Sequence, residues 1–318
     1  MKKIVALIAF FLIACSVPAF ADYIKSLNSG DYDAALKEIQ PLAIKGDAKA
    51  QCYLGYMYSN GQGVKQNYTE AARWFRKAAD QGYAEAQCNL GLSYDSGQGV
   101  PKDQEEAVKW LRKAASQGFA EAQGILGVMY YNGRGVQQNY VEAAKWYRKA
   151  AEQGSVWAQG FLGIMYYNGQ GVKQDYAEAA RWYKKAAEQG SVNAQFNLGV
   201  MYSAGQGVPK SATDAVKWYK MAAENGDAGA QLNLGLMYSA GQNVKQDYSE
   251  AFLWLNLAAV QGNKEAEKAR DMIREMMTQE QLDKARELTE DLKKKISRNA
   301  RQTVGKPAKK AQGSNVKN

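Results

Sequence analysis

Pairs of glycines separated by one residue, such as Gly169 and Gly171, are the residues whose spacing suggests chemistry most directly. A glycine-rich turn ahead of a helix exposes backbone N–H groups that bind phosphate. A nucleotide site needs one such turn, but five pairs occur here at intervals of 36 residues, and a sixth turn carries Asn243 in the second position. No Gly-Lys-Ser/Thr follows these pairs. We therefore expect structural turns with a positive φ at the second residue, which asparagine tolerates.

Residues for common catalytic centres are missing from the chain. Histidine is absent from all 318 residues, which excludes Ser-His-Asp triads, His-ligated zinc and His acid–base catalysis. A Ser-x-x-Lys spacing occurs at Ser314 and Lys317, inside a segment with no folded pattern. We therefore expect no enzymatic activity, no metal and no cofactor.

Two cysteines, Cys52 and Cys88, occupy equivalent positions in neighbouring repeats. A disulfide requires Cα atoms within about 7 Å, whereas the axes of packed helices lie about 8–10 Å apart. Buried free thiols are the expectation, and a strained disulfide in an oxidising compartment is the alternative.

The first 21 residues have the pattern of a secretory signal peptide. Lys2 and Lys3 precede an apolar run, residues 4–14, that is too short to span a bilayer. We expect cleavage after Ala21 and a periplasmic or secreted protein. The alternative is a lipoprotein anchored through Cys15, because residues 12–15 resemble a bacterial lipobox. No later segment has the apolar length of a transmembrane helix.

The net charge of +9 resides in the C-terminal segment, residues 293–318, which holds nine Lys/Arg and no acidic residue. From Asp22 to Leu292 there are 30 basic and 32 acidic residues. A nearly neutral body argues against specific nucleic-acid binding. The basic tail is either a solvated disordered end or a contact to an anionic envelope surface.

Six units of 36 residues follow one another without insertion over residues 48–263, which is typical of a stacked helical solenoid. The first helix of each unit places small and apolar residues on one face, as in Ala158, Leu162, Gly163 and Tyr166. Glycine in the middle of a helix costs about 1 kcal/mol relative to alanine. Its presence at this position in all six units predicts a close approach of the second helix.

The second helix of each unit begins with a capping-box pattern, as in Asp175 and Glu178, in which each side chain binds a free backbone N–H. An apolar stripe follows, and Gly190 is placed to end the helix in a left-handed conformation. One tryptophan recurs in each stripe and is predicted to be core: Trp74, Trp110, Trp146, Trp182, Trp218 and Trp254.

Together these motifs resemble the SEL-one-like repeat family, which is related to the tetratricopeptide repeats. The resemblance implies an all-α fold, a right-handed superhelical α/α solenoid of 36-residue helix-turn-helix repeats. We divide the chain into a signal peptide (1–21), N-terminal capping helices (22–47), six repeats (48–263), C-terminal capping helices (264–297) and a basic disordered tail (298–318). Thr278 and Gln281 predict a capping box at the start of the last helix.

In tetratricopeptide relatives, the first helices line a concave groove that binds partners. By resemblance, we assign a partner-binding groove to the same positions here, with Gly124 and Gly160 opening space beside its aromatic side chains. The alternative is that Trp157 and Phe161 only fill gaps between repeats. The predicted groove residues are Asn89, Tyr131, Trp157, Phe161, Tyr167, Asn197 and Asn233.

The family resemblance and the missing catalytic residues predict a non-enzymatic, monomeric interaction scaffold in the bacterial envelope. Its expected partner is a protein, bound as an extended peptide or a helix. An envelope-polymer assembly factor, possible for a lipid-anchored protein with a basic tail, is one alternative. Binding or hydrolysis of β-lactam compounds, which some cysteine-rich relatives are associated with, is another, although the regular cysteine pairs of those relatives are missing here.

Overall fold

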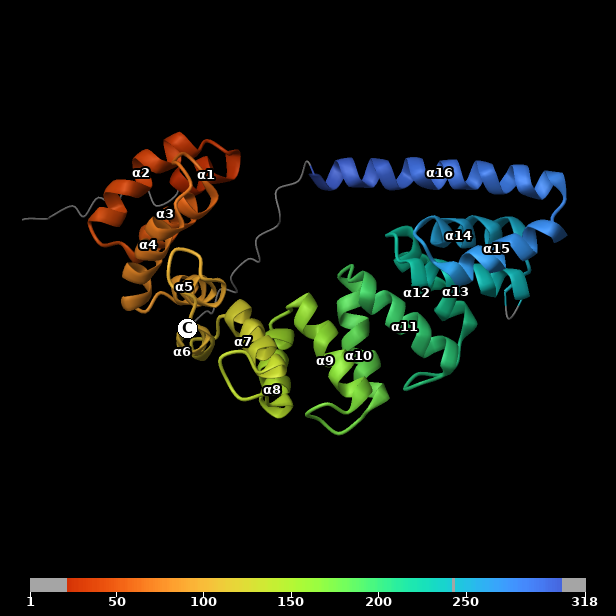
Figure 1. The fold of residues 1–318 in the computed structure, drawn as a ribbon, viewed down its shortest axis with the longest axis horizontal. Coiled ribbons are helices and arrows are strands. Elements are labelled where there is room, and N and C mark those ends of the chain that lie inside the picture. Colours follow the sequence, from red (N-terminus) through yellow and green to blue (C-terminus); the bar gives the residue numbers. More distant parts are fainter. Residues whose placement is uncertain (1–21, 242–243, 305–318) are drawn as a thin grey trace, which may run out of the picture. The chain divides into compact units, whose positions relative to one another are not determined.

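A computed structural model describes residues 22–241 and 244–304. This part of the chain consists of sixteen helices and contains no strand (Figure 1). The expected all-α fold is confirmed. The helices are α1 (Asp22–Ser29), α2 (Tyr32–Ile44), α3 (Ala48–Asn60), α4 (Tyr68–Asp80), α5 (Ala84–Ser96), α6 (Gln104–Ser116), α7 (Ala120–Asn132), α8 (Tyr140–Glu152), α9 (Val156–Asn168), α10 (Tyr176–Glu188), α11 (Val192–Ala204), α12 (Ala212–Glu224), α13 (Ala228–Ala240), α14 (Tyr248–Val260), α15 (Lys264–Met276) and α16 (Gln279–Val304).

The chain forms two compact units. The first holds α1 to α4 together with Gln98–Val100. Its core contains the fully buried side chains of Tyr23 and Ile39 beside Leu54 and Trp74, so the helices ahead of the first repeat close the N-terminal end of its apolar face.

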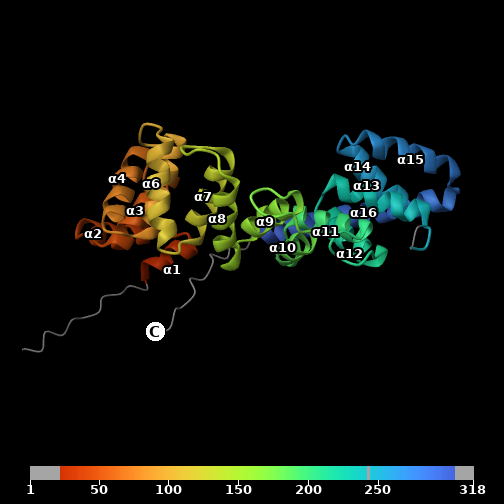
Figure 2. The same cartoon turned by 90° about the horizontal axis from the view of Figure 1, so that it is seen from below.

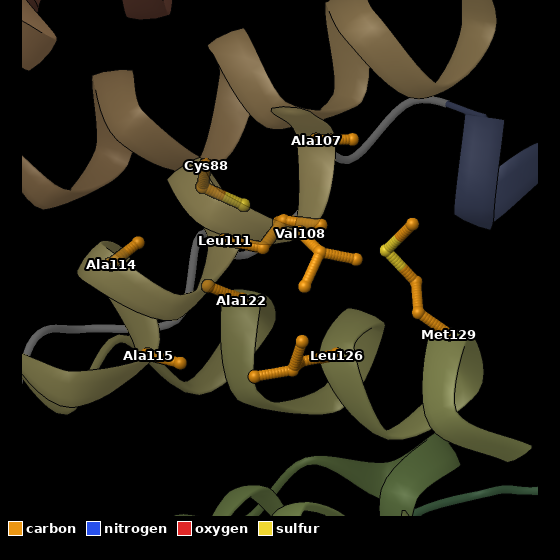
Figure 3. Close-up of a cluster of buried hydrophobic side chains, with 9 residues drawn as sticks. All are labelled: Cys88, Ala107, Val108, Leu111, Ala114, Ala115, Ala122, Leu126 and Met129. Atoms are coloured by element: carbon orange, nitrogen blue, oxygen red, sulfur yellow. The ribbon is translucent and has the colours of Figure 1, made fainter. Parts of the chain in front are cut away.

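The second unit holds α5 to α16, apart from the short segment that joins the first unit. Each odd-numbered helix from α7 to α13 packs against the helix after it and the helix before it, and Figure 2 shows α7 and α8 side by side. Small and branched side chains fill the space between them. Figure 3 shows one such cluster, in which Leu111 of α6 and Leu126 of α7 are completely buried.

The glycine in the middle of each first helix lies against a side chain of the second helix, as predicted. A Cβ atom added at Gly163 would lie 2.7 Å from the ring of Tyr183, and one added at Gly127 would lie 2.7 Å from the ring of Tyr147. Real Cβ atoms do not approach other atoms so closely. Glycine therefore permits the contact between the two helices of a repeat, although it lowers the helix propensity.

The second glycine of each turn explains why the pairs recur. Gly171 has φ +68, and a Cβ atom there would lie 2.1 Å from the carbonyl oxygen of Tyr140 in the preceding repeat. Gly207 has φ +69 and makes the same approach to Tyr176. These turns are repeat-to-repeat packing contacts. The corresponding prediction for Asn243 lies outside the described residues.

The N-caps of the second helices are confirmed, but their reciprocal half is wrong. The Asp175 carboxylate accepts from the Glu178 backbone N–H at 3.0 Å. The Asp175 N–H, however, donates to the carbonyl oxygen of Tyr166 in the first helix. The Glu178 carboxylate pairs with Arg181 instead. This happens because the first helix ends close enough to supply an acceptor that an isolated helix lacks.

The C-terminal end is closed by α15 and α16. Thr278 and Gln281 form the predicted capping box in both directions, at 2.9 and 3.3 Å. Leu292 of α16 packs into the core formed by α12 to α14, and Lys284 pairs with Asp247 at the start of α14. The last helix continues to Val304, past the expected end at Ser297, so residues 298–304 are helical rather than a disordered tail.

Tryptophans of the second helices are core residues, with one difference. Five are 2–8% exposed, whereas Trp146 is half-buried. Lysines lie over several of the rings, for example Lys113 over Trp110 at 3.8 Å and Lys185 over Trp182 at 4.2 Å. In these cation–π contacts the lysine ammonium groups lie over the faces of the indole rings.

Candidate functional site

An aromatic cluster lies on α9 at the start of the fourth repeat. The Phe161 ring stacks on Tyr147 with centroids 5.3 Å apart, and Trp157 meets both rings edge to face at about 6 Å. Tyr147 is 1% exposed, whereas Trp157 and Phe161 are 39% and 38% exposed. A buried tyrosine therefore supports two large rings that remain accessible.

We use the word joint for the contact between consecutive repeats that involves these equivalent positions. The third–fourth joint consists of Gly124, Tyr147, Trp157 and Phe161. A Cβ atom at Gly124 would lie 2.3 Å from the six-membered ring of Trp157. The space beside Gly124 is thus occupied by the indole. The expectation that Gly124 opens free space is wrong, because the next repeat supplies the side chain that fills it.

The fourth–fifth joint consists of the equivalent residues Gly160, Tyr183, Asn193 and Asn197. A Cβ atom at Gly160 would meet no atom within 4 Å. An open pocket of about 140 Å³ lies there, and Ile164 also lines it. The expectation of space beside Gly160 is confirmed, because the short Asn193 stands where the preceding joint has Trp157.

The lining of the fourth–fifth joint includes two polar side chains, Tyr183 and Asn197. Among the described residues, the structure gives no hydrogen bond to the side chains of Tyr183 and Asn197, which both line the pocket. Burial raises the pKa of Tyr183, and the nearby Tyr167 raises it further, so its hydroxyl stays protonated. A neutral hydroxyl and an amide can each donate and accept hydrogen bonds.

At the fifth–sixth joint, formed by Phe196, Tyr219, Gly229 and Asn233, the same positions satisfy one another. Tyr219 forms hydrogen bonds with Asn233 and Ser203, and burial raises its pKa to about 12 although both bonds lower it. Phe196 packs against Tyr219 at 6.0 Å and lies 3.1 Å from where a Cβ of Gly229 would be. This joint is closed.

The predicted groove tyrosines outside the aromatic cluster bind the turn of the next repeat. The Tyr131 hydroxyl lies 3.1 Å from Gln170 Oε1, and the Tyr167 hydroxyl lies 3.0 Å from Gln206 Oε1. Both side chains are half-buried. They link consecutive repeats near the C-terminal ends of the first helices.

The three predicted asparagines differ in their surroundings. Asn89 donates to the carbonyl oxygen of Glu85 in its own helix at 2.8 Å, and Asn233 bonds to Tyr219. Asn197 lines the open pocket. Of the seven predicted residues, the structure brings Trp157, Phe161 and Asn197 to one site, with Asn193 and Tyr183 as members that the sequence reasoning did not assign.

A buried glutamine in each first helix was also not anticipated. Gln159 donates to the Ala151 carbonyl of the preceding repeat at 3.0 Å and accepts from Gln189 at 2.8 Å. In the fifth repeat, Gln195 donates to the preceding repeat, but its Oε1 is buried without a hydrogen-bond partner. Asn225 replaces the donor glutamine there and bonds within its own helix. The recurrence of glutamine every 36 residues is the sequence signal from which this contact could have been predicted.

The described residues hold no cluster of three or more His, Cys, Asp or Glu that suits a metal ion. Cys52 and Cys88 are buried thiols. Burial, followed by Glu121 and Glu85, raises the pKa of Cys88, which keeps the thiol protonated and unreactive. None of the helices in the described ranges combines the length and apolar character needed to cross a bilayer.

The sequence pattern of the Sel1 repeat matches residues 48–83, 84–119, 120–155, 158–191, 192–227 and 228–263. The chain belongs to the Sel1 repeat family. The matches coincide with the expected repeat boundaries except for the first two residues of the fourth repeat. Sel1 repeat proteins generally act as protein-interaction scaffolds, and their fold is typically non-catalytic.

Two solved Sel1 repeat structures support the fold. The chain is 40% identical to c5321, a protective antigen of uropathogenic Escherichia coli, with a TM-score of 0.74 over 83% of this chain and 58% of that one. A Sel1 repeat protein from Oxalobacter formigenes is 39% identical, with a TM-score of 0.64 over 74% of this chain and 94% of that one. The match therefore spans little more than half of c5321. None of the curated proteins matches significantly.

Proposed function

We propose that this Sel1 repeat protein is a non-enzymatic scaffold that binds a protein partner, as an extended peptide or a helix, along the first helices of the third to fifth repeats. The exposure of Trp157 and Phe161 carries the proposal. Large aromatic side chains supply much of the binding energy of protein interfaces. Here they are held by the buried Tyr147 and border a pocket with unpaired polar groups.

Rigidity of the cluster supports the same proposal. Phe161 is restrained by stacking on Tyr147, and Trp157 is seated on Gly124, so neither ring loses much freedom when a partner binds. Preorganised contacts of this kind improve affinity because less entropy is lost on binding.

Export to the bacterial envelope is part of the proposal. Support comes from the signal-peptide pattern of residues 1–21 and from the relative c5321, which is a protective antigen. Mass spectrometry of the mature N-terminus tests it. A first residue of Asp22 supports a released protein, a lipid on Cys15 supports an anchored one, and an intact Met1 contradicts export.

Selection of binding peptides from a display library against the full mature chain tests the scaffold function. Replacing both Trp157 and Phe161 by alanine is expected to lower the affinity for the selected peptides at least tenfold. Met221→Ala is the matched control, because Met221 is 36% exposed but lies on a second helix. Equal affinity for the double variant, with its helical circular dichroism intact, contradicts the proposal.

A further inference from the structure

Among the three central joints, only the fourth–fifth joint has no aromatic ring of the chain beside its glycine. At the third–fourth joint, Trp157 of the following repeat covers Gly124. At the fifth–sixth joint, Phe196 fills the equivalent position from the preceding repeat and lies over Gly229. Between Gly160 and Asn193, no side chain does so.

The tyrosine of each joint shows the same difference. The ring centroid of Tyr147 lies 6.1 Å from that of Trp157, and the ring centroid of Tyr219 lies 6.0 Å from that of Phe196. Tyr183 occupies the equivalent position in the open joint and lines the pocket. Because the backbone arrangement repeats every 36 residues, the two neighbouring joints show which kind of group fits this space.

We propose that the pocket at Gly160 is the anchor site for one aromatic side chain of the partner peptide. The partner's ring takes the place over Gly160 that Trp157 takes over Gly124, and it contacts Tyr183, Phe161 and Ile164. This inference rests on the proposed scaffold function and specifies what the site recognises.

The size and lining of the pocket agree with this occupant. Its volume is about 140 Å³, and an apolar cavity of about 150 Å³ is known to hold benzene, the ring of a phenylalanine side chain. Trp157, Phe161 and Ile164 of α9 contribute apolar groups to the lining, and Asn193 and Asn197 of α11 contribute amides. The asparagine amides are placed to bond to the peptide groups that flank the anchor, because those groups lose water when the ring is buried.

Binding of N-acetyl-phenylalanine amide to the full mature chain, followed by NMR, tests the anchor site. We expect a saturable dissociation constant on the order of 1 mM, as is usual for a ligand of this size. N-acetyl-alanine amide should bind at least tenfold more weakly. Shifts should be centred on Gly160 and Asn197.

Two variants fill the pocket from within the chain. Asn193→Trp copies the third–fourth joint, and Gly160→Phe copies the fifth–sixth joint. Both are expected to weaken the binding of N-acetyl-phenylalanine amide at least tenfold, while Met221→Ala leaves the affinity unchanged. Since the two substitutions come from different helices, a folding defect in one of them leaves the other to decide, with circular dichroism as the check.

Several results would overturn the inference. These are the lack of saturable binding, equal binding of the alanine amide, and full affinity in both filled variants. The display peptides separate this inference from the scaffold function. Peptides that depend on Trp157 and Phe161 but keep their affinity for Asn193→Trp overturn the anchor site alone. A failure of every peptide to bind overturns the scaffold function. If N-acetyl-phenylalanine amide still binds in that case, the pocket accepts an aromatic ring but has no peptide partner.

Discussion

Helices α9 and α11 occupy equivalent places in consecutive repeats, yet the same two positions carry opposite chemistry. Trp157 and Phe161 of α9 form an aromatic cluster over Tyr147, whereas Asn193 and Asn197 of α11 line an open pocket. Both helices nevertheless stack on the helix before them in the same way. The helices therefore stack alike although the side chains at these two positions differ.

A third difference between the two helices concerns the buried glutamine. Gln159 of α9 is fully bonded, since Gln189 donates to it at 2.8 Å. Gln195 of α11 keeps one buried oxygen without a partner, because Asn225 is one methylene shorter than the glutamine found in the other repeats. The fifth repeat thus combines an unfilled joint with an unsatisfied buried group, and it is expected to be less stable than the fourth.

The largest expected effect tests whether stacking is the same in both regions. Gly163→Ala places a methyl group 2.7 Å from the ring of Tyr183, which is 3% exposed. We expect a loss of about 1–3 kcal/mol in the free energy of unfolding, measured in urea. Gly127→Ala, which faces Tyr147 at the same distance, should lose a similar amount. A difference above about 1 kcal/mol between them would show that the two regions stack differently.

Trp157→Asn gives the filled joint the residue type that the open joint has at the same position. Full truncation of a buried tryptophan costs about 3–5 kcal/mol, and Trp157 is 39% exposed, so we expect a loss of about 1–2 kcal/mol. The space over Gly124 should then take a second molecule of N-acetyl-phenylalanine amide, measured as a doubled stoichiometry in NMR titration. An unchanged stoichiometry would mean that the pocket depends on more than the missing ring.

Asn225→Gln should restore the missing glutamine contact in the fifth repeat. The added methylene lets the amide reach Gln195 Oε1, as Gln189 reaches Gln159 in the fourth repeat. A gain of about 1 kcal/mol is expected in urea unfolding. The reciprocal variant Gln189→Asn should lose a comparable amount. If Asn225→Gln does not stabilise the protein, the assigned contact is contradicted.

The smallest expected effect is a gain from Gly160→Ala. A methyl group there meets no atom within 4 Å, so only the helix propensity of the backbone changes. The expected gain is about 0.5–1 kcal/mol, seen as a higher Tm. Gly160 and Gly163 lie three residues apart on α9, and the same substitution should have opposite signs at the two positions.

Much of the fold was predictable from the sequence because it depends on local patterns. The period of the repeats, the mid-helix glycines, the N-cap residues and the turn glycines each reflect a backbone requirement that one residue type satisfies. The reciprocal half of the caps was not predictable in this way. The N–H of Asp175 bonds to Tyr166, and that acceptor becomes available only when the first helix has packed beside the second.

The candidate site was less predictable for a related reason. Gly124 and Gly160 have the same position in their repeats, and the sequence alone treats them alike. Their surroundings differ because of Trp157 and Asn193, which belong to the next repeat along the chain. Tyr131, in turn, bonds to a turn 39 residues away. Pairings across repeats require a three-dimensional register that the periodicity of single repeats does not supply.

The turn glycines have a consequence for how such proteins diversify. Gly171 and Gly207 approach main-chain carbonyls of the preceding repeat, so the spacing of the repeats is set by backbone against backbone. Exchange of an exposed side chain of the first helices does not alter these backbone contacts. Natural selection can therefore exchange the residues facing a partner one repeat at a time, and new specificities can arise without redesign of the scaffold.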